Sequence, residues 1–407
     1  MSADSVTIVM IISPLAEYWI WFTSCFGMNG RVWDVVSKFE SVKDAYLALN
    51  DRSIAEKILT QKELHNISST SLEHAKVIVN DCFDKDIGII SFDDNNYPSS
   101  LKSVYNPPCH LFYKGDISCL EENVVLSVVG ARRPSEYSIA VTSALVKNLV
   151  SYGIAIASGF AKGIDITSHL SCISAGGKTA AILGCGINYD YPADNIVHRD
   201  TIINNGVMIS EYYPNAAPSA LSFPQRNRIL SGLSLGTIVI EAGEKSGSLV
   251  TANLALSQGK DIFCIPPHNI FDKRYSGNIG LLRDGAIPIF GIRDILYEYY
   301  ENYSHKLTEK KMASVMITEF TQNNDDTNNI AAEHENIQAN DYAHDFSSLS
   351  EEETAIAEIL SKSTEPVIAD DIAAILSMEI SDVLALLTDL EIEGIAENCG
   401  GQSYKLK

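Results

Sequence analysis

The sequence predicts an α/β fold built on a mostly parallel β-sheet. Between residues 124 and about 300, short apolar runs alternate with segments of helical periodicity, as expected for strand–helix–strand units. The run Val124–Val129 enters Gly130 as a buried parallel strand enters a turn. The predicted strands are Val124–Val129, Ile154–Ala157, Thr179–Leu183, Val207–Ile209, Thr237–Ile240, Asp261–Ile265 and Ala286–Phe290. Helices are predicted at Ser138–Tyr152, Asp165–Ala175 and Ser248–Gln258.

Four segments follow from the patterning along the chain. Residues 1–87 are predicted to form a small helical, SAM-like domain, because apolar residues recur at helical spacing. Residues 88–302 contain the sheet and begin with an extended section, 88–115, that is interrupted by prolines. Residues 303–348 are polar and acidic, which predicts a flexible linker. Residues 349–407 contain three amphipathic helices and a terminal hairpin, the pattern of a winged-helix-like domain. The predicted N-terminal helices are Val32–Phe39, Val42–Leu49, Ile54–Leu59 and Ser71–Phe83.

Charge and cysteine content limit the classes of function. The net charge is −22, but residues 124–300 hold 14 basic and 13 acidic residues, whereas the remainder holds 16 basic and 39 acidic ones. The central region is therefore not dominated by the acidity of the rest, because charges beyond about 8 Å are screened at physiological salt. The eight cysteines form no Cys-x-x-Cys pair, which favours a reducing, cytoplasmic environment. The apolar stretch Val6–Ile12 is too short to span a membrane.

The loops that follow successive strands share one chemistry. Glycines and other small residues allow backbone N–H groups to approach an anion, and helix N-termini add partial positive charge. Basic side chains beside such turns can contact phosphates. Because these loops converge on one edge of the sheet, we expect a groove for phosphates there. Its predicted residues are Gly130, Arg132, Arg133, Gly159, Lys162, Gly163, Gly247 and Ser248.

A further basic pair, Arg226 and Arg228, stands at the start of a predicted helix and resembles a clamp on a nucleic-acid backbone. The alternative is an ordinary helix surface with salt bridges. Aromatic residues near the loops could stack unpaired bases, with core packing as the alternative for most of them. They are Tyr137, Phe160, Tyr189, Tyr191, Tyr212, Tyr213 and Phe223.

Enzymatic signatures are weak. The sequence has no Walker A loop, no Gly-x-Ser-x-Gly elbow and no His-Glu-x-x-His pair. Asp165 and His169 are spaced so that they could touch, but a capping aspartate and a packed histidine are the favoured interpretation. Glu211 and Glu241 follow strands without the partners that a metal site needs. We therefore expect no catalytic residue, no metal and no cofactor.

Several motifs in order carry a family resemblance: "VVGARRPSEYS", "SGFAKGIDITSH", "AILGCGINYDYP", "FPQRNRILSGLS" and "EAGEKSGSLVTANLALSQGKDIFCIPP". Together they resemble the DprA/Smf DNA-processing protein family. The resemblance implies an extended Rossmann-like fold that binds single-stranded DNA without cutting it. It also implies protection of incoming strands in natural transformation, loading of RecA recombinase onto them for homologous recombination, and a homodimer formed through the Rossmann-like domain.

The resemblance assigns roles residue by residue. Arg132 corresponds to a phosphate-binding arginine, and Lys162 stands where the family usually has arginine. Two positions depart from the family pattern. Pro267 replaces a usual glycine, and Ile279 stands where asparagine is expected, with Asn278 one position earlier.

The sequence thus predicts a single-stranded-DNA-binding, recombinase-loading protein. One alternative is a nucleotide-processing Rossmann enzyme of the phosphoribohydrolase type, using Glu241 or Asp165. Another is a protein-interaction scaffold dominated by its acidic ends. In the terminal domain, residues 350–397 are acidic and the expected recognition helix has no Arg or Lys, so a protein contact is favoured over duplex DNA.

Overall fold

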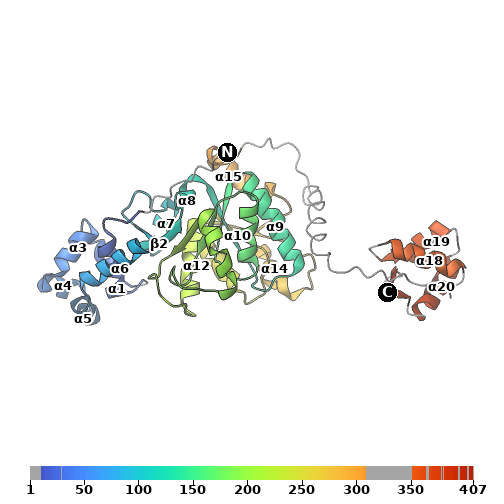
Figure 1. Ribbon diagram of the computed structural model, residues 1–407, viewed down its shortest axis with the longest axis horizontal. Helices are drawn as coiled ribbons and strands as arrows, with labels where there is room; N and C mark the ends of the chain where they lie inside the picture. Colours follow the sequence, from blue (N-terminus) through green and yellow to red (C-terminus); the bar gives the residue numbers. More distant parts are fainter. Residues whose placement is uncertain are drawn as a thin grey trace. The chain divides into compact units, whose positions relative to one another are not determined.

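The computed structural model describes residues 11–28, 30–308, 351–363, 366–376, 378, 380–392, 395–400 and 403–406. These residues form two compact units, one before and one after the predicted linker in the sequence, and Figure 1 colours them by residue number. Residues 309–348 of that linker, and residues 6–10 of the apolar stretch, lie outside the described residues. Within the described ranges, no helix has the length and apolar character needed to cross a membrane.

The N-terminal segment is helical, as predicted. Serine, aspartate and threonine side chains cap the four helices α3 to α6, and Thr60 forms a capping box with Glu63 at the start of α5. The helices are α1 (Ala16–Phe26), α2 (Val32–Val36), α3 (Val42–Leu49), α4 (Arg52–Ile58), α5 (Gln61–Ser69) and α6 (Leu72–Asp84). The sequence had not predicted α1 or α5 as separate helices.

A nine-stranded sheet forms the centre of the first unit, in the order β1-β2-β6-β5-β4-β3-β7-β8-β9. From β6 onwards in this order, each strand pairs in parallel with its neighbour. Strands β1 and β2 are antiparallel additions at the β6 edge. The predicted mostly parallel α/β fold is therefore confirmed. The strands are β1 (Gly88–Ser91), β2 (His110–Gly115), β3 (Val124–Val129), β4 (Ile154–Ser158), β5 (Thr179–Ile182), β6 (Gly206–Ser210), β7 (Gly236–Val239), β8 (Asp261–Cys264) and β9 (Ile287–Pro288).

Helices cover both faces of this sheet, which explains why its strands are almost entirely apolar. Alternate residues of β3 face opposite layers: Val125 packs in the core formed with α12 and α13, and Val124 packs in the core formed with α9 and α10. The helices of this region are α7 (Ser99–Lys102), α8 (Cys119–Glu122), α9 (Glu136–Ser151), α10 (Ile164–Ser174), α11 (Arg199–Asn204), α12 (Ser222–Leu233), α13 (Gly247–Ser257), α14 (Ser276–Arg283) and α15 (Arg293–Tyr303).

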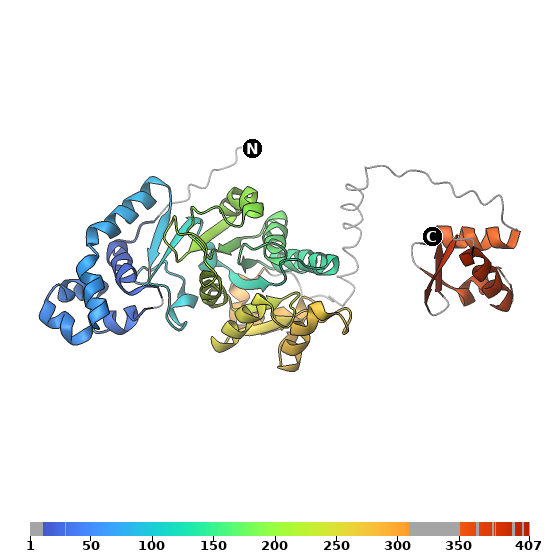
Figure 2. The same cartoon turned by 90° about the horizontal axis from the view of Figure 1, so that it is seen from below.

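The N-terminal helices share a hydrophobic core with the sheet, so they are not an independent unit. Figure 2 shows these blue helices beside the cyan strands of the sheet edge. Trp19 Nε1 donates to Asp93 at 2.7 Å, and Trp33 Nε1 donates to the Pro107 carbonyl at 2.9 Å. Tyr213 Oη lies 2.6 Å from Ser24 Oγ. These contacts fix the helices to the β1–β2 edge and to the loop after β6.

The second unit is a winged helix, as predicted. Its strands form a three-stranded antiparallel sheet in the order β10-β12-β11. Ile356, Leu360 and Leu387 are buried in its core. The elements are α18 (Glu351–Lys362), β10 (Val367–Ile368), α19 (Ala369–Leu376), α20 (Ile380–Ile392), β11 (Ala396–Gly400) and β12 (Ser403–Leu406).

Two buried histidines make the stability of the first unit sensitive to acid. Burial lowers the pKa of His110 and of His169 to about 3, whereas an unfolded histidine has a pKa near 6.5. Between these two pKa values, the unfolded chain therefore binds more protons than the folded one. The contribution of the two neutral histidines to stability is complete above about pH 6.5 and is lost as the pH falls. Between about pH 6.5 and 5, the free energy of unfolding should fall by about 2 kcal/mol per histidine.

Urea denaturation at a series of pH values measures this effect. A His110→Leu variant should show about half of the wild-type pH dependence in this window. A free energy of unfolding that does not change between these pH values would contradict the buried, neutral state of both rings.

Candidate nucleic-acid interface

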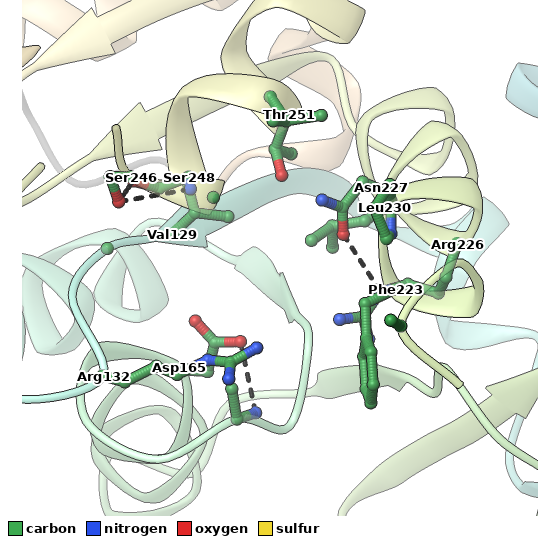
Figure 3. A pocket seen from close by; sticks show the side chains of 16 residues that line it. Val129, Arg132, Asp165, Phe223, Arg226, Asn227, Leu230, Ser246, Ser248 and Thr251 are labelled. Carbon is green, nitrogen blue, oxygen red and sulfur yellow. Dashed lines mark hydrogen bonds between the residues drawn. The ribbon is translucent and has the colours of Figure 1, made fainter. Parts of the chain in front are cut away.

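A groove of about 630 Å³ opens at the carboxyl ends of β3 and β4, between the N-terminal ends of α12 and α13. Figure 3 shows Ser246, Ser248 and Thr251 on one side of it, with Arg132 and Phe223 at its other walls. The residues that line it are Val129, Gly130, Arg132, Ala161, Asp165, Ala220, Phe223, Pro224, Arg226, Asn227, Leu230, Ser246, Gly247, Ser248, Val250 and Thr251.

Arg132 is the exposed cation of this groove. Its guanidinium carbon lies 6.0 Å from the centre of the Phe223 ring, within the range of a cation–π contact. The ring in turn rests on backbone, because a Cβ atom at Gly184 would lie 2.6 Å from Phe223 Cδ1. Tyr191 supports the ring from the side, with the centroids 5.5 Å apart. Arg133 is also exposed, but it does not line the groove.

The glycines of the first two loops allow the loops to interlock. A Cβ atom at Gly130 would lie 2.7 Å from Ile164 Cγ1, at the first residue of α10. Gly163 has a φ of 77°, and a Cβ there would lie 2.3 Å from the Ala131 carbonyl oxygen. Ile164 N donates to that same carbonyl at 3.1 Å. These two glycines hold the Arg132 turn in place, and Gly163 itself lies outside the groove lining.

Arg226 is a wall of the groove and not an exposed contact. Only 5% of the residue is accessible, and Nη1 donates to the carbonyls of Gly159, at 2.8 Å, and Ile182. Burial lowers the pKa of Arg226, and the nearby Asp165 carboxylate opposes that change. The guanidinium thereby ties the ends of β4 and β5 together. Its predicted direct contact with phosphate would require these hydrogen bonds to break.

Arg228 lies outside the groove. Its Nη2 is 2.5 Å from Glu211 Oε1, and the two side chains are 12% and 5% exposed. Within the described part of the chain, its Nε and Nη1 atoms have no hydrogen-bond partner. Arg228 therefore belongs to a buried ion pair beneath α12, and the structure does not place it where the predicted clamp needs it.

The remaining predicted residues lie on two sides of the groove. Lys162 lines a smaller adjoining cavity together with Gly159, and its Nζ is 2.5 Å from Asp194 Oδ2 at the surface. The groove side has the N-terminus of α13, where Ser246 caps the helix by accepting from Ser248 N at 3.4 Å. Gly247 is exposed, and a Cβ there would meet no atom within 4 Å. The first turn of α13 is therefore accessible to an anion.

The acidic groups named for an enzyme have structural partners. Glu241 Oε2 accepts from Ser135 N at 2.9 Å and from Ser135 Oγ at 2.7 Å, and so it fixes the turn that carries Arg132. Asp165 accepts from the backbone N–H groups of Gly159 and Ala161. Burial raises the pKa of Asp165, and Arg226 opposes this change. His169 Nδ1 lies 2.7 Å from Thr179 Oγ1, so it is not paired with Asp165.

Asn278 has a role that the sequence did not reveal. Its side-chain oxygen accepts from Ala242 N at 2.7 Å, and Nδ2 donates to the carbonyls of Ile240 and Ile265 at 2.9 Å. The side chain is fully buried and joins the ends of β7 and β8. Among the residues that the structure describes, no cluster of three or more His, Cys, Asp or Glu side chains could hold a metal ion.

The fold and the groove define a class of Rossmann-like proteins with an open, cationic carboxyl edge. The family model described as DNA recombination-mediator protein A matches residues 88–300. The DprA winged helix domain matches residues 344–402. The chain belongs to the DprA/Smf family of DNA processing proteins.

Individual relatives agree with this assignment. The DNA processing protein DprA of Bacillus subtilis is 40% identical over 215 residues, which cover 53% of this chain and 72% of the relative. That of Streptococcus pneumoniae is 38% identical over 206 residues, or 51% of this chain and 72% of the relative. The crystal structure of the Streptococcus pneumoniae protein has a TM-score of 0.62 at 32% identity and covers 71% of this chain and 99% of that one.

Proposed function

We propose that this chain binds single-stranded DNA in the groove, with phosphates at Arg132 and at the N-terminus of α13. The observation that carries the proposal is the exposed Arg132 guanidinium beside the Phe223 ring, opposite the open first turn of α13. The guanidinium and the helix N-terminus can each bind a phosphate, and the aromatic ring can stack a base between them. Nothing in this set reads base edges, so we expect little sequence preference.

A single strand fits this arrangement better than a duplex. Stacking on Phe223 requires an unpaired base with a free face, and a duplex base pair has both faces covered by its neighbours. Asp165, which lines the groove, and Glu241, which holds the Arg132 turn, already accept hydrogen bonds from the backbone. The proposed activity is therefore binding and not cleavage.

Fluorescence anisotropy with labelled oligonucleotides of one sequence, single-stranded and annealed, tests the proposal. We expect the single strand to bind at least about fivefold more tightly at the same salt concentration, since one stacked base contributes about 1–3 kcal/mol. Equal or tighter binding of the duplex would contradict it. Release of a base from nucleoside monophosphates, abolished by Glu241→Gln, would instead support a nucleotide-processing enzyme.

We further propose that the bound strand is transferred to a RecA-type recombinase and that the protein acts as a homodimer. The family description as a recombination mediator supports this role. A strand-exchange assay with RecA, on DNA first coated with single-strand-binding protein, should start faster when this protein is added. Light scattering should give twice the monomer mass. An unchanged rate of strand exchange would contradict the transfer to a recombinase. A monomeric mass at micromolar concentration would contradict the homodimer.

Asp194 should weaken DNA binding by competing for Lys162. Their exposed ion pair must break before Lys162 can contact a phosphate. Because exposed pairs contribute up to about 1 kcal/mol, Asp194→Asn should raise the affinity for single strands by up to about fivefold. The slope of log K against log salt should become steeper by about 0.7, the value for one additional phosphate contact. An unchanged affinity and slope would show that Lys162 does not touch the DNA.

A further inference from the structure

The loop between β8 and α14, residues 266–275, exposes two large apolar side chains beside the groove edge. Phe271 is 85% exposed and Ile270 is 68% exposed. Parallel strands are about 4.8 Å apart, and β8 is next to β7, whose following loop leads to α13. The loop therefore extends the same carboxyl edge by one strand beyond the groove.

The loop is firmly anchored although its tip is exposed. Tyr275 is buried, and its hydroxyl lies 3.0 Å from Ser135 Oγ and 2.7 Å from Ser138 Oγ, behind the turn that carries Arg132. Gly277 N donates to the Ala242 carbonyl at 2.8 Å. These contacts connect the loop to the segments that follow β3 and β7.

Local hydrogen bonds also order the tip itself. Asn269 Oδ1 accepts from Phe271 N at 2.9 Å, and Asp272 Oδ1 accepts from Arg274 N at 2.9 Å. The Phe271 ring is thus presented on a pre-formed turn, so a partner that binds it would not have to order the loop first.

Exposed lysines lie on the two neighbouring loops of this edge. Lys245 and Lys273 are exposed, and the Lys273 carbonyl oxygen lies 3.8 Å from where a Cβ of Gly243 would stand, two residues before Lys245. The acidic residues here are Glu244 and Asp272, and Asp272 is already paired with Arg274 at 2.6 Å. Within the described ranges, neither lysine forms an ion pair. An exposed aromatic ring on the same edge as these lysines has the composition of a stacking site with phosphate contacts.

We propose that the DNA strand continues from the groove across the N-terminus of α13 and stacks a further base on Phe271, with Lys245 and Lys273 at its phosphates. This inference rests on the proposed binding of single strands and adds a second base site to it. A nucleic acid fits this surface better than a second copy of the chain, because a symmetric contact would bring the lysines of both copies together.

A ladder of oligothymidines of about 3 to 16 nucleotides, measured by anisotropy at constant salt, tests this extension. The wild-type affinity should rise again when the strand becomes long enough to reach Phe271. Phe271→Ala should bind the short oligomers as the wild type does and lose at least about fivefold for the long ones. Lys273→Glu should show the same dependence on length.

Two matched variants serve as controls. Phe83→Ala removes a ring that is 64% exposed near the start of β1, at the opposite edge of the sheet. Lys147→Glu makes the same charge change on the exposed surface of α9. Both should bind every length as the wild type does.

The outcomes separate this inference from the proposed function. If the wild type binds and Phe271→Ala binds long oligomers equally well, the second base site is wrong and the groove stands. If Phe271→Ala weakens all lengths alike and also halves the mass in light scattering, the ring belongs to a contact between copies and the inference is overturned. If the wild type binds no oligomer at any length, both proposals fail.

Discussion

Arg132→Glu is expected to weaken the binding of single-stranded DNA by about 10- to 100-fold, for all sequences alike. The substitution removes a charge-assisted hydrogen bond to phosphate, which contributes about 1.5–3 kcal/mol, and places a negative charge in the groove. It also removes the cation beside Phe223. Titration of several unrelated oligonucleotides by anisotropy measures the loss.

The fold should not change in this variant, because the Arg132 side chain is exposed and the turn is held by Gly163 and Glu241. The unfolding temperature should therefore match that of the wild type. Lys147→Glu on α9, with the same change in charge, should keep full affinity. Equal losses in both variants would mean that net charge and not the groove determines binding.

Arg228→Ala is expected to destabilise the protein by about 3–5 kcal/mol, the typical effect of leaving one partner of a buried ion pair unpaired. Glu211 would remain buried with no cation beside it. Urea denaturation measures the loss. Under conditions where the variant is folded, its affinity for single-stranded DNA should equal that of the wild type, because Arg228 lies outside the groove.

The double variant Arg228→Met, Glu211→Leu separates this structural role from a DNA contact. Replacing both charges with apolar groups of similar size should recover most of the lost stability. A double variant that is stable yet has lost DNA affinity would show that Arg228 contacts DNA after all, as the sequence had predicted.

Sequence periodicity was sufficient for the central fold because the strands are buried on both faces. Val124–Val129 was predicted with its observed bounds, since a continuous apolar run that ends at glycine has few other structures available. The antiparallel pairing of β2 with β6, which joins the β1–β2 pair to the sheet, was missed. Antiparallel edge strands depend on a partner that is distant in the sequence, here about 100 residues along the chain.

The two arginines of α12 show what the sequence could not predict about the groove. Arg226 and Arg228 were assigned to one phosphate clamp, but residues two apart on a helix do not share a face. This spacing alone could have shown that both cannot reach the same groove. Which of the two arginines lies in the groove wall depends on which face of α12 packs against the sheet. No local sequence pattern shows the direction in which this helix packs. The position of Arg132, directly after a buried strand, was predictable because turns at strand ends leave little freedom.

The salt dependence of binding to a mixed-sequence single strand tests the central claim most directly. If phosphates at Arg132 and the N-terminus of α13 dominate, log K should fall linearly with log salt, with a slope of about −0.7 for each phosphate neutralised. The account predicts a slope of about −1.4 for the wild type and a shallower slope, by about 0.7, for a neutral Arg132→Gln variant. An affinity that is insensitive to salt, or a slope that Arg132→Gln leaves unchanged, would contradict it.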